Sequence, residues 1–227
     1  MRYVGGKSRI ANWVVSNLKK LGIPNIVEPF CGGLSITREL LPSFASDRCE
    51  SLITLYKHLQ QGWIPPDNIS EAEYRKVREE NDPTNPLYAF CAFGCSFGGK
   101  FWGGYAREGK RNFALNAKNS LLDKIHDCKN IDFRYGGYDE QSYEPGCLIY
   151  CDIPYLGTTQ GYQHQFNYHA FYRWCQRMQN EYTIVVSEFT KPQGSEILAC
   201  KSSVSDLRTT KRAQSTNECL FIYRNKQ

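Results

Sequence analysis

The spacing of apolar residues changes along this chain, and each change predicts a different element. Ile10, Val14 and Leu18 recur at intervals of three to four, which predicts a helix over 7–21 that ends before Gly22. Short apolar runs bounded by turn residues predict strands instead. The other expected elements are, in order, strand 25–28, helix 35–41, strand 44–47, a helix to about 61, strands 131–135 and 147–151, helix 168–180, and strands 183–189 and 218–223. This alternation is typical of an α/β domain.

A different pattern interrupts the alternation after Trp63-Ile64-Pro65-Pro66. From there to about residue 120 the chain favours helices and loops, with little strand character. We therefore predict a main domain of residues 1–62 and 121–227, interrupted by an inserted subdomain of residues 63–120. The length of 227 residues fits one domain with one insertion.

Composition narrows the class of protein. A hydrophobic content of 41% and a charged content of 22% are ordinary for a globular protein, and the net charge of +5 permits a polyanionic partner. The 10 cysteines form no CxxC pair and have no histidines at zinc-finger spacing, so we expect no structural metal site and mostly free cysteines in apolar surroundings. We see neither a secretory leader nor an apolar run of about 20 residues, so we expect a reducing compartment and no membrane span.

The segment Asp152-Ile153-Pro154-Tyr155 is the strongest candidate for chemistry. It follows the apolar run 147–151, so it lies where a buried strand leaves the sheet. Ligands of open α/β sheets bind beyond the carboxyl ends of the strands. A carboxylate beside an aromatic ring is suited to hold a flat ring that bears an amine. The alternative interpretation is a plain Asp-Pro turn after a strand.

Two glycine turns near the N-terminus are candidate ligand sites. Glycines such as Gly32 in the segment 27–35 let the backbone approach a ligand at the start of a helix. Asp47 lies about 15 residues further on, where dinucleotide-binding folds place an acid that binds ribose hydroxyls. Gly5-Gly6-Lys7 is a candidate anion site, and a simple N-terminal turn is the alternative.

Aromatic, glycine and basic residues alternate over residues 97–111. A loop of this composition can lie along phosphates and stack on bases, so we expect its basic side chains to contact nucleic acid. These side chains are Lys100, Arg107, Lys110 and Arg111. The alternative is a solvated loop anchored by its aromatic residues.

In their order along the chain, these motifs resemble the adenine-N6 DNA methyltransferases of the Dam-like (D12) class, particularly short phage-encoded members. The resemblance runs from Tyr3 to Tyr223 and is especially close over 93–100, 147–159 and 186–188. It implies a Rossmann-like class I methyltransferase sheet with helices on both faces and an insertion that recognises DNA. It also implies S-adenosylmethionine as the cofactor, double-stranded DNA as the partner, no metal, and the cytoplasm of a bacterial or phage-infected cell.

The resemblance also assigns roles to residues. It implies that Asp152, Ile153, Pro154 and Tyr155 are the catalytic segment. The target adenine must leave the duplex stack before its amine can react. Asp152 and the backbone carbonyl of Ile153 would then accept hydrogen bonds from that amine, and Tyr155 would stack on the ring. The implied cofactor-binding residues are Tyr3, Lys7, Glu28, Phe30, Gly32, Asp47 and Asp152, with Asp47 as the ribose acid.

Two residues depart from the family motifs. Ile153 stands where the family has a proline, which costs rigidity because proline fixes φ. Leu34 stands where the glycine turn has its last glycine, and we expect this leucine either to crowd the cofactor or to leave its role to Gly33. A DNA-binding protein that has lost catalysis is therefore the alternative function. Methylation of cytosine N4 or of adenine in RNA shares the same acceptor geometry, and neither the target sequence nor the oligomeric state, monomer or weak dimer, follows from the motifs.

Overall fold

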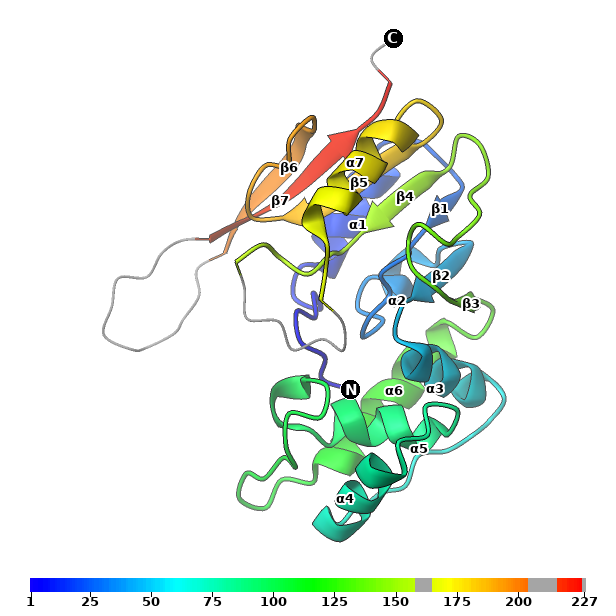
Figure 1. Cartoon of the computed structure of the whole chain (residues 1–227), viewed down its shortest axis with the longest axis vertical. Helices are drawn as coiled ribbons and strands as arrows, with labels where there is room; N and C mark the ends of the chain where they lie inside the picture. The colour runs from blue at the N-terminus through cyan, green and yellow to red at the C-terminus, as the bar shows by residue number, and fades with distance from the viewer. Residues whose placement is uncertain (158–164, 204–215, 226–227) are drawn as a thin grey trace, which may run out of the picture.

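The computed structural model describes residues 1–157, 165–203 and 216–225, and Figure 1 shows how its elements are arranged. The strands are β1 (Ile26–Val27), β2 (Phe44–Asp47), β3 (Asp132–Tyr135), β4 (Leu148–Cys151), β5 (Thr183–Glu188), β6 (Glu196–Ser203) and β7 (Thr216–Tyr223). The α-helices are α1 (Ala11–Lys19), α2 (Thr37–Leu40), α3 (Glu50–Gln60), α4 (Glu71–Glu80), α5 (Pro86–Ala89), α6 (Phe113–Asp127) and α7 (Tyr168–Met178). Two further short helices are η1 (Phe90–Gly94) and η2 (Phe97–Gly99).

The sheet confirms the predicted α/β class. Five strands lie in the order β1-β4-β5-β7-β6, and β2 and β3 form a parallel pair beside them. A parallel bridge between Glu28 and Ala45 joins the two groups, so the complete order is β3-β2-β1-β4-β5-β7-β6. The pairs from β3 to β5 are parallel, and β7 is antiparallel to both β5 and β6. The parallel strands therefore direct their carboxyl ends to one edge, where ligands of such sheets bind.

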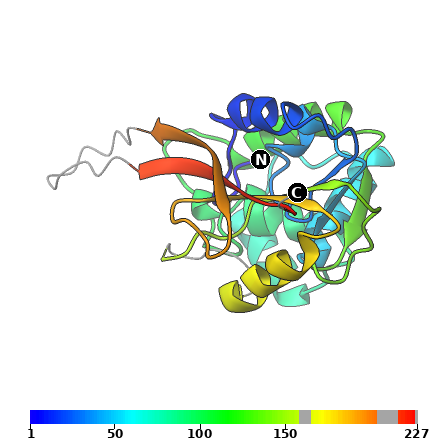
Figure 2. The same cartoon turned by 90° about the horizontal axis from the view of Figure 1, so that it is seen from above.

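Helices cover both faces of this sheet. Side chains of a strand alternate between faces, and β4 shows the alternation clearly. Leu148 and Tyr150 pack in one cluster with residues of α1, whereas Ile149 and Cys151 pack in another with residues of α7. Figure 2 shows α1 and α7 on opposite sides of the strands. Because β4 is buried on both faces, its apolar run fits a central parallel strand.

The helices from α4 to α6, which lie between β2 and β3 in the chain, are seen below the sheet in Figure 1. Local signals fix where they begin: Ser70 and Glu73 form a capping box on α4, and Asn112 accepts from the Leu115 N–H at the start of α6. Their buried residues share one core with α3 and with Ala45 and Phe133 of β2 and β3. α6 continues past residue 120, and the bounds of the inserted subdomain stay a prediction.

Most expected elements are present, and β6 is an addition. Among the residues that the structure describes, β6 pairs only with β7, and its register shifts between Ile197 and Ala199. Residues 158 and 159, part of one segment of close resemblance, lie outside the described residues. Among the described residues, no helix has both the length and the apolar character needed to cross a bilayer.

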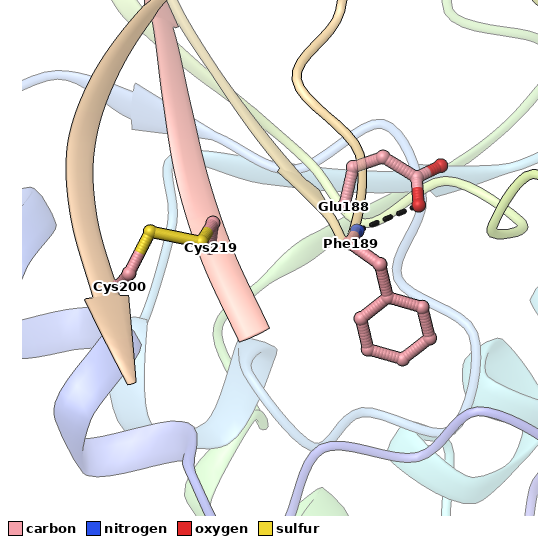
Figure 3. The surroundings of a disulfide bond; sticks show 4 residues. All are labelled: Glu188, Phe189, Cys200 and Cys219. Atoms are coloured by element: carbon pink, nitrogen blue, oxygen red, sulfur yellow. Dashed lines mark hydrogen bonds between the residues drawn. A yellow bond between two sulfur atoms is a disulfide. The ribbon is translucent and has the colours of Figure 1, made fainter. Parts of the chain in front are cut away.

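A disulfide that the cysteine spacing does not predict joins β6 to β7 (Figure 3). Cys200 and Cys219 face each other in the antiparallel register, which brings their Cα atoms within 4.1 Å. The other eight cysteines are free and buried, as expected for cysteines in apolar runs.

Leu34 behaves differently from the expectation. Its φ is +57°, so the leucine itself adopts the left-handed conformation, and its role does not pass to Gly33. The side chain is completely buried in the core shared by α3 and the inserted helices. The leucine therefore does not crowd the ligand cavity described below. A left-handed leucine costs about 1–2 kcal/mol, which this packing offsets.

We expect Leu34→Gly to lower the free energy of unfolding by roughly 1–3 kcal/mol, measured by urea denaturation. The substitution relieves the backbone strain but removes a fully buried side chain. Leu41→Gly is the matched control, because Leu41 also has a positive φ, of +52°, but is 55% exposed. The control should keep or raise stability. A more stable Leu34→Gly protein would show that strain outweighs packing at this turn.

Candidate functional site

A cavity of about 310 Å³ lies at the carboxyl ends of β1, β2 and β4. Its volume is at the lower end of the range for small-molecule sites. All the predicted cofactor residues line it: Tyr3, Lys7, Glu28, Phe30, Gly32, Asp47 and Asp152. Pro154 of the predicted catalytic segment lines it as well. The topology thus brings together residues separated by up to 151 positions at the sheet edge where ligands bind.

The glycine turn forms the floor of this cavity under the ring of Tyr3. A Cβ atom on Gly32 would lie 2.9 Å from Tyr3 Cε1, and one on Gly33 would lie 2.6 Å from Tyr3 Cβ. Gly32 also has a φ of +43°. Both glycines are therefore required by the close approach of Tyr3, which in turn packs on Phe93 with ring centroids 5.1 Å apart.

Asp47 fixes the shape of the turn. Its Oδ2 accepts from the Gly32 N–H at 3.0 Å, and its Oδ1 accepts from the Cys49 N–H at 2.9 Å. Burial raises the pKa of this carboxyl, and the backbone N–H groups oppose that shift. A carboxylate has about four lone-pair sites, so Asp47 retains capacity to accept from a ligand hydroxyl.

Glu28 is a buried acid on the wall of the cavity. Glu28 is 1% exposed, and within the described residues its Oε2 has no hydrogen-bond partner. Burial raises the pKa of this carboxyl well above its usual range. A buried, unpaired polar atom beside a cavity is a position that a ligand donor would satisfy.

Aromatic rings form the opposite wall. The ring of Phe30 stacks on Tyr138 with centroids 5.7 Å apart and meets Phe166 edge-on at 5.8 Å. Tyr138 and Phe166 both line the cavity, and the motifs point to neither. Only the spatial approach of residues far apart in the chain reveals them. The cavity thus combines apolar ring surfaces with acidic groups, which suits a nucleoside-like ligand.

Asp152 lines the cavity and is paired with Lys7, which lines it too. The Lys7 Nζ is 3.1 Å from Asp152 Oδ1. Burial raises the pKa of Asp152 to about 6, although Lys7 opposes the shift. Lys7 is itself deeply buried, which lowers its pKa, but Asp152 and Glu218 more than compensate and the net shift is upward. At neutral pH the pair is therefore an ammonium and a carboxylate.

Pro154 lines the cavity, but its neighbours Ile153 and Tyr155 do not. Ile153 is 2% exposed, and its side chain packs in the core cluster that contains the buried residues of α7. The ring of Tyr155 meets Phe189 edge-on with centroids 4.5 Å apart, and its hydroxyl contacts Lys7 and Glu218.

Glu188 at the end of β5 holds the chain that follows the catalytic segment. It accepts from the Leu156 N–H at 2.9 Å and from the Phe189 N–H at 2.7 Å, the second of which Figure 3 shows. Burial raises the pKa of Glu188, and these backbone bonds oppose the shift. Glu188 and Glu218 are not among the candidate site residues that the motifs give. Their signal is an acid near an apolar run: Glu188 ends β5 after Ile184-Val185-Val186-Ser187, and Glu218 precedes the apolar run from Cys219 to Tyr223.

The four predicted DNA-contact residues lie apart from this cavity. Arg107 forms an ion pair with Glu71 of α4, and Arg111 forms one with Glu108 at 3.0 Å. The side chains of Arg107 and Arg111 are 68% and 37% exposed, so these pairs contribute little to stability and leave the guanidinium groups able to exchange partners. Lys100 and Lys110 take part in no ion pair within the described residues. The side chains of Lys110 and Arg111 border a second hollow beside α6.

The N-terminal segment connects the basic loop, residues 97–111, to the cavity. The Val4 N–H donates to the Gly99 carbonyl at 3.2 Å. A Cβ atom on Gly99 would lie 2.7 Å from the backbone carbon of Arg2, so only glycine permits the contact. Gly99 has a φ of +68°, which also favours glycine. Residues 2–4 therefore touch the loop on one side and supply Tyr3 and Val4 to the cavity on the other.

Comparison with known proteins supports the resemblance found in the sequence. Residues 3–92 match the family model described as D12 class N6 adenine-specific DNA methyltransferase. This match covers the glycine turn and Asp47 but ends before the catalytic segment. No curated protein sequence matches the chain.

Solved structures add a distant likeness. One of 26 matching chains is the crystal structure of SMU.472, described as a candidate methyltransferase complexed with SAH. It is 11% identical, with a TM-score of 0.41, and the alignment covers 97% of this chain. The chain spans only 54% of the length of that protein. A likeness at this level carries no argument about function.

Proposed function

We propose that this chain, whose residues 3–92 match the D12 class of N6 adenine-specific DNA methyltransferases, transfers a methyl group from S-adenosylmethionine to N6 of adenine in double-stranded DNA. The observation that carries the proposal is the position of Asp152. Its carboxylate lies at the end of β4, at one end of a cavity with aromatic walls, and the glycine turn and Asp47 lie in the matched region. A DNA substrate would place the enzyme in the cytoplasm of a bacterial or phage-infected cell.

The cavity residues fit S-adenosylmethionine. Asp47 would accept from the ribose hydroxyls, and Phe30 and Tyr138 would flank the adenine ring of the cofactor. The unpaired Oε2 of Glu28 would meet a donor of the amino-acid part. When bound, this cofactor supplies a methyl group activated by a sulfonium. Leu34 leaves room for it, because the leucine side chain packs in the core.

The remaining residues position the target adenine. Asp152 and the backbone carbonyl of Ile153 accept hydrogen bonds from the N6 amine and fix its orientation. The ring of Tyr155 stacks on the base after the base leaves the duplex. Orientation of this kind can supply a large part of the rate acceleration without a covalent intermediate. Since Ile153 acts through its backbone, the absence of the family's proline leaves this acceptor in place.

Transfer of a labelled methyl group to mixed-sequence duplex DNA, followed by nucleoside analysis, tests the proposal. N6-methyladenine is the expected product. N4-methylcytosine, or labelling of RNA alone, would replace the proposed substrate with another amine. DNA binding without any transfer would instead favour a protein that has lost catalysis, and absence of S-adenosylmethionine binding in calorimetry would strengthen that outcome.

The basic loop gives a second prediction about the same function. We expect the double variant Lys110→Ala/Arg111→Ala to weaken DNA binding and to reduce the slope of log K against log salt by about 0.9 for each phosphate that the protein no longer neutralises. The matched control is Lys19→Ala/Lys20→Ala, which removes two adjacent exposed charges from the end of α1. Fluorescence anisotropy over a range of salt concentrations measures both. An unchanged slope in the loop variant would remove these residues from the DNA interface.

A further inference from the structure

Glu218 is a buried acid that does not line the cavity but contacts Lys7, which does. It lies on β7, 66 positions after Asp152, and is only 7% exposed. The strand around it is apolar, from Cys219 to Tyr223, so a charged side chain here requires a partner.

A single oxygen of Glu218 serves two residues of the site. Its Oε1 accepts from Lys7 Nζ at 2.9 Å and also from the Tyr155 hydroxyl. The same Lys7 Nζ lies 3.1 Å from Asp152 Oδ1. Glu218 therefore contacts both the ammonium that pairs with Asp152 and the aromatic residue that follows it.

The charges of this group explain why two acids are needed. Asp152, Glu218 and Lys7 together carry two negative charges and one positive charge. If Asp152 were the only carboxylate near Lys7, the two would form a one-to-one ion pair that occupies the acceptor. With Glu218 present, Lys7 is shared between two acids, and Asp152 retains more capacity to accept from a ligand amine.

We infer that Glu218 is a positioning residue for methyl transfer, which holds Lys7 and the Tyr155 hydroxyl so that the Asp152 carboxylate and the Tyr155 ring are presented to the target base. The inference rests on the proposed function. It assigns Glu218 no contact with the methyl group or with the base. Its effect is exerted through the two residues that it binds.

The test compares the pH profile of kcat/KM for Glu218→Gln with that of the unchanged protein. In the unchanged protein, activity should fall below about pH 6, where Asp152 becomes protonated and can no longer accept from the amine through both oxygens. Burial is the main cause of the raised Asp152 pKa, and the Glu218 charge adds to it. Removal of that charge lowers the Asp152 pKa and leaves Lys7 closer to Asp152 alone, which lowers it further.

We therefore expect the acid limb of Glu218→Gln to move to lower pH. We also expect the plateau of kcat/KM to fall by about 10–100-fold, because a neutral amide holds the Lys7 ammonium and the Tyr155 hydroxyl more weakly than the carboxylate does. The other ionisable groups that face Asp152 are the same in Glu218→Gln and in the unchanged protein, so their presence does not explain a difference between the two pH profiles. These groups are Lys7, Glu28, Tyr150, Tyr155 and Glu188.

Two further variants separate charge from structure. Glu196→Gln removes the same charge from the neighbouring strand β6, where the side chain is 44% exposed, and should leave the profile unchanged. Glu218→Asp keeps the charge but shortens the reach, so its plateau should fall while its acid limb stays close to the original midpoint. A lower plateau in Glu218→Gln with an unmoved acid limb would indicate a merely structural role and overturn the inference, as would an unchanged profile.

A measurement without catalysis distinguishes this inference from the proposed function. Carbon-13 NMR can follow the Asp152 carboxyl during a pH titration, with the signal assigned by its loss in Asp152→Asn. A lower titration midpoint in Glu218→Gln supports the coupling even if no methyl is transferred to DNA. Equal midpoints in the two proteins reject it even if the unchanged protein is an active methyltransferase.

Discussion

Replacement of Asp152 with alanine is expected to reduce methyl transfer by at least about 10³-fold, because it removes the acceptor that we propose to orient the N6 amine. The carboxylate is also the only negative charge placed at the carboxyl end of β4 within the catalytic segment. Asp152→Asn should retain part of the activity, since its amide oxygen can still accept one hydrogen bond. Labelled-methyl transfer under single-turnover conditions measures both variants.

The fold should survive the substitution. Lys7 keeps Glu218 as a carboxylate partner at 2.9 Å, so the buried ammonium is not left unpaired. Thermal unfolding near that of the unchanged protein is therefore expected. Asp132→Ala provides the control, because Asp132 is an exposed acid of β3 whose carboxylate pairs only with the nearby Arg134 among the described residues. If Asp152→Ala transfers methyl groups at the normal rate, the proposed mechanism is wrong.

Asp47→Ala is expected to weaken binding of S-adenosylmethionine by about 10–100-fold, since a charged hydrogen bond contributes about 1.5–3 kcal/mol. Two effects combine here. The variant cannot form the predicted hydrogen bond to the ribose, and the Gly32 and Cys49 N–H groups have no acceptor to shape the turn. Each unsatisfied N–H lowers stability by about 1–3 kcal/mol.

Asp47→Asn separates these two effects. The amide has one oxygen where the carboxylate has two. It can therefore replace the acceptor of one of the two N–H groups but not of both. We expect calorimetry to show cofactor affinity between those of the alanine variant and the unchanged protein, with most of the stability restored. Asp132→Asn again provides an exposed acid as the control. Unaltered cofactor affinity in Asp47→Ala would assign Asp47 a purely structural role in the turn.

Strongly patterned elements are predictable from the sequence of this chain. β2 has the predicted bounds, because the segment from Phe44 to Asp47 lies between the turn residues Pro42-Ser43 and the helix that follows. β6 has no counterpart among the predicted strands, because it is an edge strand with a shift in register and its pairing depends on β7 rather than on its own pattern. The disulfide depends on the same pairing, since Cys200 and Cys219 face each other only once that register is set.

The site is predictable where motifs carry it and not where distant parts of the chain meet. The motifs lead to Asp47 and Asp152, and both line the cavity. Glu218 contacts Lys7 across 211 positions of sequence, a pairing that no local spacing encodes. Leu34 is a residue for which the sequence motif alone predicts the wrong effect. Residue type alone predicts that its left-handed backbone is unfavourable, whereas tertiary packing of the side chain compensates for it.

The contact between Gly99 and the N-terminal segment has a thermodynamic consequence. Residues 2–4 are a wall shared by the cavity and the basic loop, so an occupant that shifts Tyr3 also shifts the backbone against which Gly99 rests. Linkage requires the effect to be reciprocal: whatever factor a cavity ligand contributes to DNA affinity, DNA contributes to the affinity of that ligand. If DNA binds the basic loop as proposed, we expect the cavity and the loop to be coupled through the contact between residues 2–4 and Gly99.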